Sequence, residues 1–179
     1  ISIATARAGN VIGGGDWSEN RLIPDIIRAM REKKSLMIRN PESKRPWQHV
    51  LEPLFGYLML GIGLYKNPKK FNSSWNFGPL NEDSLSVKNI IEVSKKFNMI
   101  NKVIYKKGEF FEAKVLKLNI DKAKKELNFK QVWNTEKTID STFEWYINYY
   151  KNDFKANDLI QNDLNNYLNV KKVKNRFRI

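Results

Sequence analysis

Apolar side chains recur along this sequence with two periods, one typical of helices and one typical of strands. Residues 22–33 have apolar side chains at 22, 23, 26, 27 and 30, which is the spacing of an amphipathic helix. Helical spacing also predicts helices over 51–66, 86–98, 121–127 and 135–152. Short apolar runs predict strands over 1–7, 35–39, 47–50, 74–77, 102–105 and 115–118. Because strands alternate with helices, we expect an α/β fold, with residues 1–7 as a buried strand.

The segments between these elements carry turn and capping residues. Glycines at 13–15 predict a loop over residues 8–20, and a polar stretch predicts a second loop over 40–46. Pro68 is expected to end the second helix, and Ser86 is expected to cap the third.

The last part of the chain is distinguished by its charge. Ile160, Leu164 and Leu168 would share one face of a helix, and basic residues are dense at 170–179. Two interpretations of residues 153–179 stay open, a basic C-terminal helix or a disordered tail. Residues 1–152 are expected to form the structured part of the chain.

Composition removes several classes of site. The 179 residues are 41% hydrophobic, which is enough to build a core, and the longest apolar candidate, 54–64, is too short to cross a bilayer. There is no cysteine, so disulfides, thiolate zinc sites and cysteine nucleophiles are excluded. His49 is the only histidine, so a multi-histidine metal site is excluded as well. The first residues have no signal-peptide pattern and are typical of a strand already under way, so we expect a piece of a longer protein.

The net charge of +13 raises the question of nucleic-acid binding. Basic residues are spread over several predicted helices, without zinc-finger spacing, an RNP-like aromatic motif or a basic zipper. Charge alone gives only nonspecific affinity, so we do not expect a nucleic-acid partner. A non-catalytic basic binding module stays open as an alternative function.

Motifs for dinucleotide chemistry are missing from the sequence. Gly9 and the glycines at 13–15 do not fit the G-x-G-x-x-G turn that lets backbone approach a pyrophosphate. Tyr-x-x-x-Lys occurs at 65–69 and at 167–171, but Pro68 interrupts the first match and the second lies in the tail. We therefore predict no catalytic residue in this chain.

Three stretches carry a family resemblance. Residues 5–17, the run Arg-Pro-Trp-Gln-His-Val-Leu-Glu-Pro at 45–53, and residues 75–79 resemble the NAD-dependent epimerase/dehydratase group of the extended short-chain dehydrogenase/reductase family, and its 4,6-dehydratases in particular. The run at 45–53 is the most specific, because related enzymes carry Arg-Asp-Trp or Arg-Asp-Tyr there. The resemblance covers about residues 3–150 and implies the C-terminal part of the family fold: the last strands of a Rossmann sheet and a small α/β substrate-binding domain.

The resemblance also implies an activity for the parent protein. An NAD cofactor would take hydride from C4 of CDP-glucose, water would leave from C5 and C6, and hydride would return to C6, giving CDP-4-keto-6-deoxyglucose. The parent would be a cytoplasmic homodimer that makes a deoxy-sugar precursor for surface polysaccharide. An epimerase or reductase of the same family, and a decayed gene fragment, stay open as alternatives.

The resemblance does not extend to the family's catalytic half. The family's Tyr and Lys and its glycine-rich turn precede the first strand, so NAD would be bound mainly by the missing N-terminal half. We expect the chain alone to be inactive. We also expect it to fold poorly, because a sheet cut at residues 1–7 exposes an edge.

The resemblance assigns candidate binding residues to this chain. Arg45 would hold the diphosphate of the nucleotide sugar, the alternative being a surface arginine in a polar loop. Asn10 would hydrogen-bond the sugar nucleotide, the alternative being a turn-stabilising side chain. Ala8 and Gly9 would lie against the nicotinamide, because small residues let a planar ring approach.

Weaker candidates follow from the same comparison of patterns. Leu22 and Ile23 would contact the nucleotide, although core packing also explains them. Arg21, Arg39 and Asn76 are candidates for phosphate, ribose or base contacts. Trp47 and His49 are expected to pack rather than to take part in chemistry. Residues 106–113, near where the family recognises the base, are less typical of it.

Overall fold

The structure, a computed structural model, describes residues 1–80, 85–98, 102–106, 115–151 and 154–170. Within these ranges each strand has one partner strand, and three of the four pairs are parallel. The parallel pairs are β1 (Thr5–Ala8) with β6 (Ser74–Phe77), β2 (Asn10–Ile12) with β5 (Trp47–His49), and β3 (Leu36–Ile38) with β8 (Val103–Tyr105). The antiparallel pair is β4 (Lys44–Arg45) with β7 (Leu85–Ser86). Parallel pairs joined through helices confirm the predicted α/β fold.

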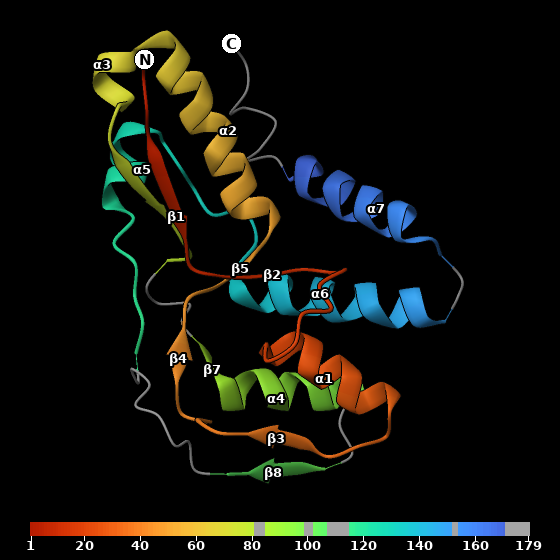
Figure 1. The fold of residues 1–179 in the computed structure, drawn as a ribbon. Coiled ribbons are helices and arrows are strands. Elements are labelled where there is room, and N and C mark those ends of the chain that lie inside the picture. Colours follow the sequence, from red (N-terminus) through yellow and green to blue (C-terminus); the bar gives the residue numbers. More distant parts are fainter. Residues whose placement is uncertain (81–84, 99–101, 107–114, 152–153, 171–179) are drawn as a thin grey trace.

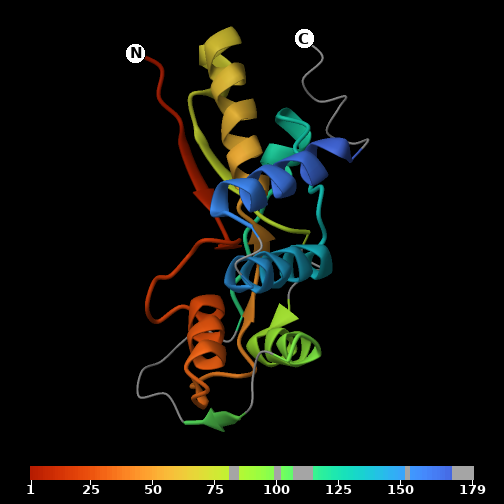
Figure 2. The same cartoon turned by 90° about the vertical axis from the view of Figure 1, so that its right-hand side faces the viewer.

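The helices divide the molecule into two ends. They are α1 (Leu22–Arg31), α2 (Leu51–Lys66), α3 (Pro68–Phe71), α4 (Val87–Lys96), α5 (Asp121–Glu126), α6 (Thr135–Tyr150) and α7 (Ala156–Asn169). Figures 1 and 2 show α2, α3 and α5 around β1 at one end, and α1 and α4 beside β3 and β8 at the other. Helix α6 crosses between the two ends, and α7 lies alongside it. No helix among the described residues has the length and apolar character to span a membrane.

Two apolar clusters form the cores of these two ends. The larger cluster joins α1, α4 and α6, and its fully buried members include Ile26, Ile90, Ile91 and Phe143. Ser94 interrupts the apolar face of α4, yet it is fully buried because its hydroxyl donates to the Ile91 carbonyl at 2.7 Å. The smaller cluster joins α2, β6 and α5 through residues such as Leu60, Trp75, Phe77, Ala123 and Phe129.

A buried carboxylate fixes the position of α2 against the segment that leads into α6. Glu52 is fully buried in the first turn of α2. Its Oε1 accepts hydrogen bonds from the backbone N–H of Val132 at 3.0 Å and of Trp133 at 2.7 Å. Asn134 then caps α6, because its side chain accepts from the Lys137 N–H. Glu52 therefore links two segments that are 80 residues apart in sequence.

Most predicted elements are present with nearly the predicted bounds. The predicted helix over 51–66 and the predicted strand over 74–77 match α2 and β6. Ser86 caps α4 as predicted, and its Oγ accepts from the Asn89 N–H at 3.2 Å. The tail forms a helix, α7, while residues 171–179 lie outside the described part.

Several strand and loop predictions were wrong. Residues 1–7 are neither all strand nor buried: β1 covers Thr5–Ala8, and Ile1 and Ile3 are exposed because β1 pairs on one side only within the described chain. The predicted loops contain the short strands β2 and β4, whose few residues give no periodicity. The predicted strand at 115–118 is a single bridge between Val115 and Lys44. Pro68 ends α2 but also opens α3.

The buried face of α7 is also displaced from the prediction. Leu159 and Tyr167 are buried, whereas Ile160 is 53% exposed. Tyr167 packs against Phe55 and Trp133, with ring centroids at 5.0 and 5.5 Å. The tail helix therefore packs against the structured part of the chain through a face one residue away from the predicted one.

We predict that Glu52→Ala lowers the free energy of unfolding by about 2–4 kcal/mol, because it leaves the buried Trp133 N–H and the half-buried Val132 N–H without their acceptor. Urea unfolding followed by tryptophan fluorescence measures the change. Glu92→Ala is the matched control, since Glu92 only forms an exposed ion pair with Lys95 and its loss should cost less than about 0.5 kcal/mol. Equal effects of the two substitutions would contradict this role of Glu52.

Candidate functional site

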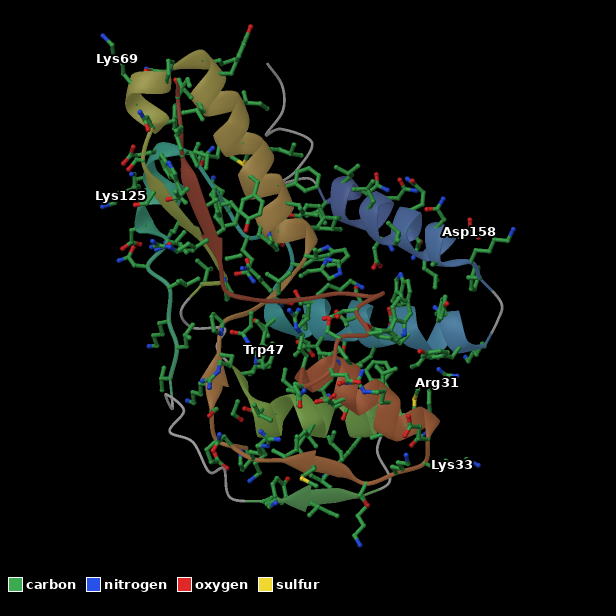
Figure 3. The ribbon with its side chains drawn as sticks, in the orientation of Figure 1. Arg31, Lys33, Trp47, Lys69, Lys125 and Asp158 are labelled. Atoms are coloured by element: carbon green, nitrogen blue, oxygen red, sulfur yellow. The ribbon has the colours of Figure 1, made fainter. Side chains whose placement is uncertain are left out.

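Most of the predicted binding residues lie around one cavity of about 720 Å³, where β1 and β2 meet the start of α1. Its lining includes Ala8, Gly9, Asn10, Arg21, Leu22, Ile23 and Arg45. The fold brings them together because the chain passes from β1 to β2 at Gly9, and β2 then pairs with β5 beside Arg45. Trp47, labelled in Figure 3, also lines the cavity.

Arg45 is a buried residue of this cavity wall. It lies on β4, is 7% exposed, and its Nη1 donates to the Lys44 carbonyl at 2.9 Å. The alternative of a surface arginine in a polar loop is therefore wrong. The planar fork of the Arg45 guanidinium matches the oxygens of a phosphate.

Asn10 is placed by strand pairing. It is the first residue of β2 and stands opposite Trp47 in the parallel register with β5. The backbone of Asn10 therefore belongs to a strand, and the choice between a binding and a turn-stabilising side chain stays a prediction. Trp47 itself is 5% exposed, and its Nε1 donates to the Leu85 carbonyl at 3.0 Å, so it packs as predicted.

The small residues at the end of β1 have different reasons to be small. A Cβ added to Gly9 would lie 2.9 Å from both Cγ and the carbonyl oxygen of Pro46, so the crossing of these two segments already requires glycine. The Gly9 N–H donates to the Phe77 carbonyl at 3.2 Å, and the same carbonyl accepts from Gln48 Nε2 at 2.9 Å. Ala8, the last residue of β1, lines the cavity with a small side chain.

Arg21 is an exposed cation at the same cavity. Its Nη1 lies 3.4 Å from Oδ2 of Asp16, another lining residue. Burial raises the pKa of Asp16, but hydrogen bonds from Ser18 and the charge of Arg21 outweigh it and leave the pKa below its usual value. Asp16 therefore stays ionised and holds the Arg21 guanidinium beside the cavity.

Tyr146 holds the loop that carries Asp16. Its hydroxyl accepts from the Asp16 N–H at 2.9 Å and donates to the Asp16 carbonyl at 2.5 Å. Burial raises the pKa of Tyr146, so it remains a phenol. Asp16 and Tyr146 were missed by sequence reasoning. The acidic residue after three glycines was a usable signal for Asp16, but nothing in the sequence relates Tyr146 to a loop 130 residues away.

The remaining predicted residues lie elsewhere. Arg39 lines a neighbouring hollow of about 510 Å³, which shares Asn20, Leu22 and Val87 with the first cavity. Asn76 lies outside both linings, and its Nδ2 donates to the Asn119 carbonyl at 3.1 Å. Ile23 is 3% exposed and also belongs to the large apolar cluster. The segment expected near the base falls mostly in 107–114, outside the described residues.

His49 is buried beside the site and is not charged at neutral pH. Burial, helped by the charge of Lys137, lowers its pKa to about 4. Its Nε2 lies 3.8 Å from Oδ2 of Asp163 on α7, and burial raises the pKa of Asp163 to about 6, with Lys137 opposing and Glu144 adding to the rise. At pH 7 this contact therefore joins a neutral imidazole to a carboxylate. The ring packs on Trp133 at 4.7 Å, in line with the predicted packing role.

Neither tyrosine of the two Tyr-x-x-x-Lys matches lines the cavity. Tyr65 is 90% exposed near the end of α2, and Lys69 lies in the separate helix α3. Tyr167 is fully buried in an aromatic cluster, and Lys171 is outside the described residues. Among the described residues there is also no group of three His, Asp or Glu side chains that could hold a metal ion.

Comparison with known proteins identifies relatives of this chain in sequence and in fold. No protein-family model matches the sequence. The chain is 41% identical over 148 residues to CDP-glucose 4,6-dehydratase from Salmonella typhimurium, which covers 82% of this chain and 41% of that enzyme. Its fold matches dTDP-glucose 4,6-dehydratase from Bacillus anthracis in complex with NAD, with a TM-score of 0.66, 20% identity, and coverage of 80% of this chain and 44% of that one. UDP-glucose 4-epimerase from Thermotoga maritima with UDP-glucose gives a TM-score of 0.70 at 18% identity, covering 84% of this chain and 47% of that one.

These matches define first a class of protein: the chain has the α/β fold of part of the extended short-chain dehydrogenase/reductase enzymes that epimerise or dehydrate nucleotide sugars. More particularly, it is a homologue of CDP-glucose 4,6-dehydratase, and it spans less than half the length of that relative. Both statements confirm the resemblance found in the sequence.

We predict opposite pH effects from His49 and Asp163. The pKa of His49 falls from 6.5 to about 4 on folding, so the unfolded state binds more protons between these values and stability rises with pH there. The pKa of Asp163 rises from 3.8 to about 6, so its contribution falls with pH over nearly the same window. In the wild-type protein the two contributions largely cancel.

Relative to wild type, Asp163→Asn should therefore add a slope of about +1 kcal/mol per pH unit between pH 4.5 and 6, and His49→Gln a slope of similar size and opposite sign. Urea unfolding at a series of pH values measures both slopes. Parallel pH profiles for the wild type and both variants would contradict the shifted pKa values of His49 and Asp163.

Proposed function

We propose that this chain forms the substrate pocket of an NAD-dependent 4,6-dehydratase that acts on CDP-glucose. The observation that supports the proposal most is the buried Arg45 in the wall of a cavity of about 720 Å³, within a homologue of CDP-glucose 4,6-dehydratase. Arg45 would form charge-assisted hydrogen bonds with the diphosphate, and Arg21 would add a second positive charge at the same cavity.

The shape of the two hollows suits an elongated ligand. The cavity at Arg45 and the hollow at Arg39 share three lining residues, so they are neighbours along one surface. A nucleotide sugar has its sugar and its nucleoside at opposite ends of a diphosphate. We place the sugar near Ala8 and Asn10 and the nucleoside toward Arg39. The neutral, packed His49 has no part in this arrangement.

NAD would supply the hydride acceptor when bound to the parent enzyme. Ala8 and Gly9 both line the cavity, and they are the residues of this chain that would lie against its nicotinamide. The sequence has no G-x-G-x-x-G turn, so we propose that the rest of the dinucleotide is held by another part of a homodimeric parent. The role of this chain is to bind the nucleotide sugar and orient it toward that cofactor.

A chimera tests the function directly. The 148 aligned residues of the Salmonella enzyme would be replaced by those of this chain, and the product from CDP-glucose and NAD would be identified by NMR. A 4-keto-6-deoxy sugar, with a methyl group at C6, would support the proposal. An epimerised or reduced sugar with C6 unchanged would favour the epimerase or reductase alternative.

In that chimera we predict that Arg45→Met lowers kcat/KM for CDP-glucose by about 10- to 100-fold, because the diphosphate loses a charge-assisted, forked partner. Lys44→Met is the matched control: it removes the same charge from the adjacent residue, whose side chain is exposed, and should change kcat/KM by less than about twofold. Direct titration of the unmodified chain with CDP-glucose and UDP-glucose measures binding affinity separately from catalysis. The basic binding module would be favoured if the affinity is the same with and without Arg45→Met, is the same for CDP-glucose and UDP-glucose, and falls only when salt is added.

A further inference from the structure

A third hollow, of about 710 Å³, lies where the loop after β2 meets the ends of α1 and α6 and the start of α7. It shares no lining residue with the cavity at Arg45. Its aromatic lining residues are Trp17, Tyr149, Tyr150 and Phe154, and Arg31 and Lys155 carry positive charge beside them. Figure 3 labels Arg31 and another lining residue, Asp158, which lie toward the same side of the molecule.

The aromatic wall of this hollow is held in place by its own contacts. Trp17 Nε1 donates to the Tyr150 hydroxyl at 2.8 Å, and the rings of Trp17 and Tyr149 have centroids 5.5 Å apart. Tyr149 in turn stacks on the buried Trp145, with centroids at 5.1 Å and planes at 15°. Trp17 is nevertheless 45% exposed and Phe154 51% exposed. Fixed, exposed aromatic faces are what a planar ring stacks on.

The charge beside this wall is net positive. The Arg31 guanidinium lies 4.4 Å from the centroid of the Tyr150 ring, so it is stacked and oriented. Among the lining side chains, Arg31 and Lys155 are opposed only by Asp158. The Asp158 carboxylate already accepts the Lys155 backbone N–H at 3.3 Å at the start of α7. An anionic group next to the stacked ring is therefore favoured.

We propose that this hollow is a second binding site, which takes a nucleotide with its base against Trp17 and Tyr149 and its phosphate beside Arg31 and Lys155. The volume of about 710 Å³ lies within the range of about 300–1,000 Å³ that small-molecule sites have. A single apolar ring would leave the net positive charge of the lining unmatched, and a simple anion would leave the aromatic faces exposed. A nucleotide matches both. Because the linings are separate, this site does not depend on the proposed nucleotide-sugar pocket.

The test is titration of the full chain with cytidine 5′-monophosphate at low ionic strength, followed by calorimetry. We expect one saturable site in Arg45→Met protein, in which the proposed sugar-nucleotide pocket is weakened. Arg31→Met should weaken binding about tenfold and Trp17→Leu at least about fivefold. Lys33→Met is the matched control, because it removes the same charge two residues from Arg31 at a side chain that does not line the hollow, and it should have an effect below about twofold.

A signal from one residue of the hollow reports binding in the wild-type chain and so does not depend on how well the variants fold. In protein labelled with 5-fluorotryptophan, the ¹⁹F resonance of Trp17 should shift on titration, whereas that of Trp75, which is 1% exposed, should not. Arg31→Lys keeps the charge without the planar stack and should retain part of the affinity.

Four results would overturn the proposal: no saturation, equal affinity in Arg31→Met and wild type, binding of inorganic phosphate as tight as that of the nucleotide, or loss of nucleotide binding in Arg45→Met. The last would assign the nucleotide to the first cavity. Self-association in sedimentation that Trp17→Leu abolishes would instead assign the hollow to a second copy of the chain. Failure of CDP-glucose binding with nucleotide binding intact would count only against the proposed function.

Discussion

The Phe77 carbonyl is the point on which the arrangement of the cavity depends. It accepts the Gly9 N–H at 3.2 Å and Gln48 Nε2 at 2.9 Å, so it joins the end of β6 both to the turn after β1 and to the middle of β5. Gln48 and Phe77 are both fully buried, which makes these bonds costly to leave unmade. At the same point Pro46 occupies the space beside Gly9. The chain can therefore leave one pair of strands and enter the next within a single residue, and the cavity opens beside that crossing.

This crossing explains why the run at 45–53 is so distinctive. Arg45 and Trp47 line the cavity, but the polar residues that follow serve the fold. Gln48 bonds to β6, His49 packs neutral against Trp133, and Glu52 accepts the N–H groups of Val132 and Trp133. A buried polar group has to find its partner at a defined distance, so each of these side chains fixes a neighbouring segment. More of these residues therefore join neighbouring segments than line the cavity.

Large apolar side chains are exposed on parts of the surface. Leu54 and Leu58 on α2 are 46% and 57% exposed, and β1 pairs on one side only within the described residues. A helix that is apolar on most of its circumference is typical of burial on more than one side. The chain spans 41% of the Salmonella enzyme, and the expectation that it folds poorly alone rests on the sheet edge at residues 1–7. The core of α1, α4 and α6 is the opposite case, because residues such as Ile26, Ile90, Ile91 and Phe143 are fully buried in it.

The sequence by itself determined the order of the main helices and strands, the α/β class and the relationship to nucleotide-sugar enzymes. These follow from local periodicity, from capping residues such as Ser86, and from a contiguous run of residues. It also pointed to Arg45 and Asn10, since both lie in stretches that resemble the family. Only the tertiary structure decided that Arg45 is buried, that Asn76 lies outside the cavity and that Tyr146 holds the loop of Asp16. Those facts depend on contacts between residues far apart in the chain, and strands as short as β2 and β4 have no periodicity until a partner strand defines them.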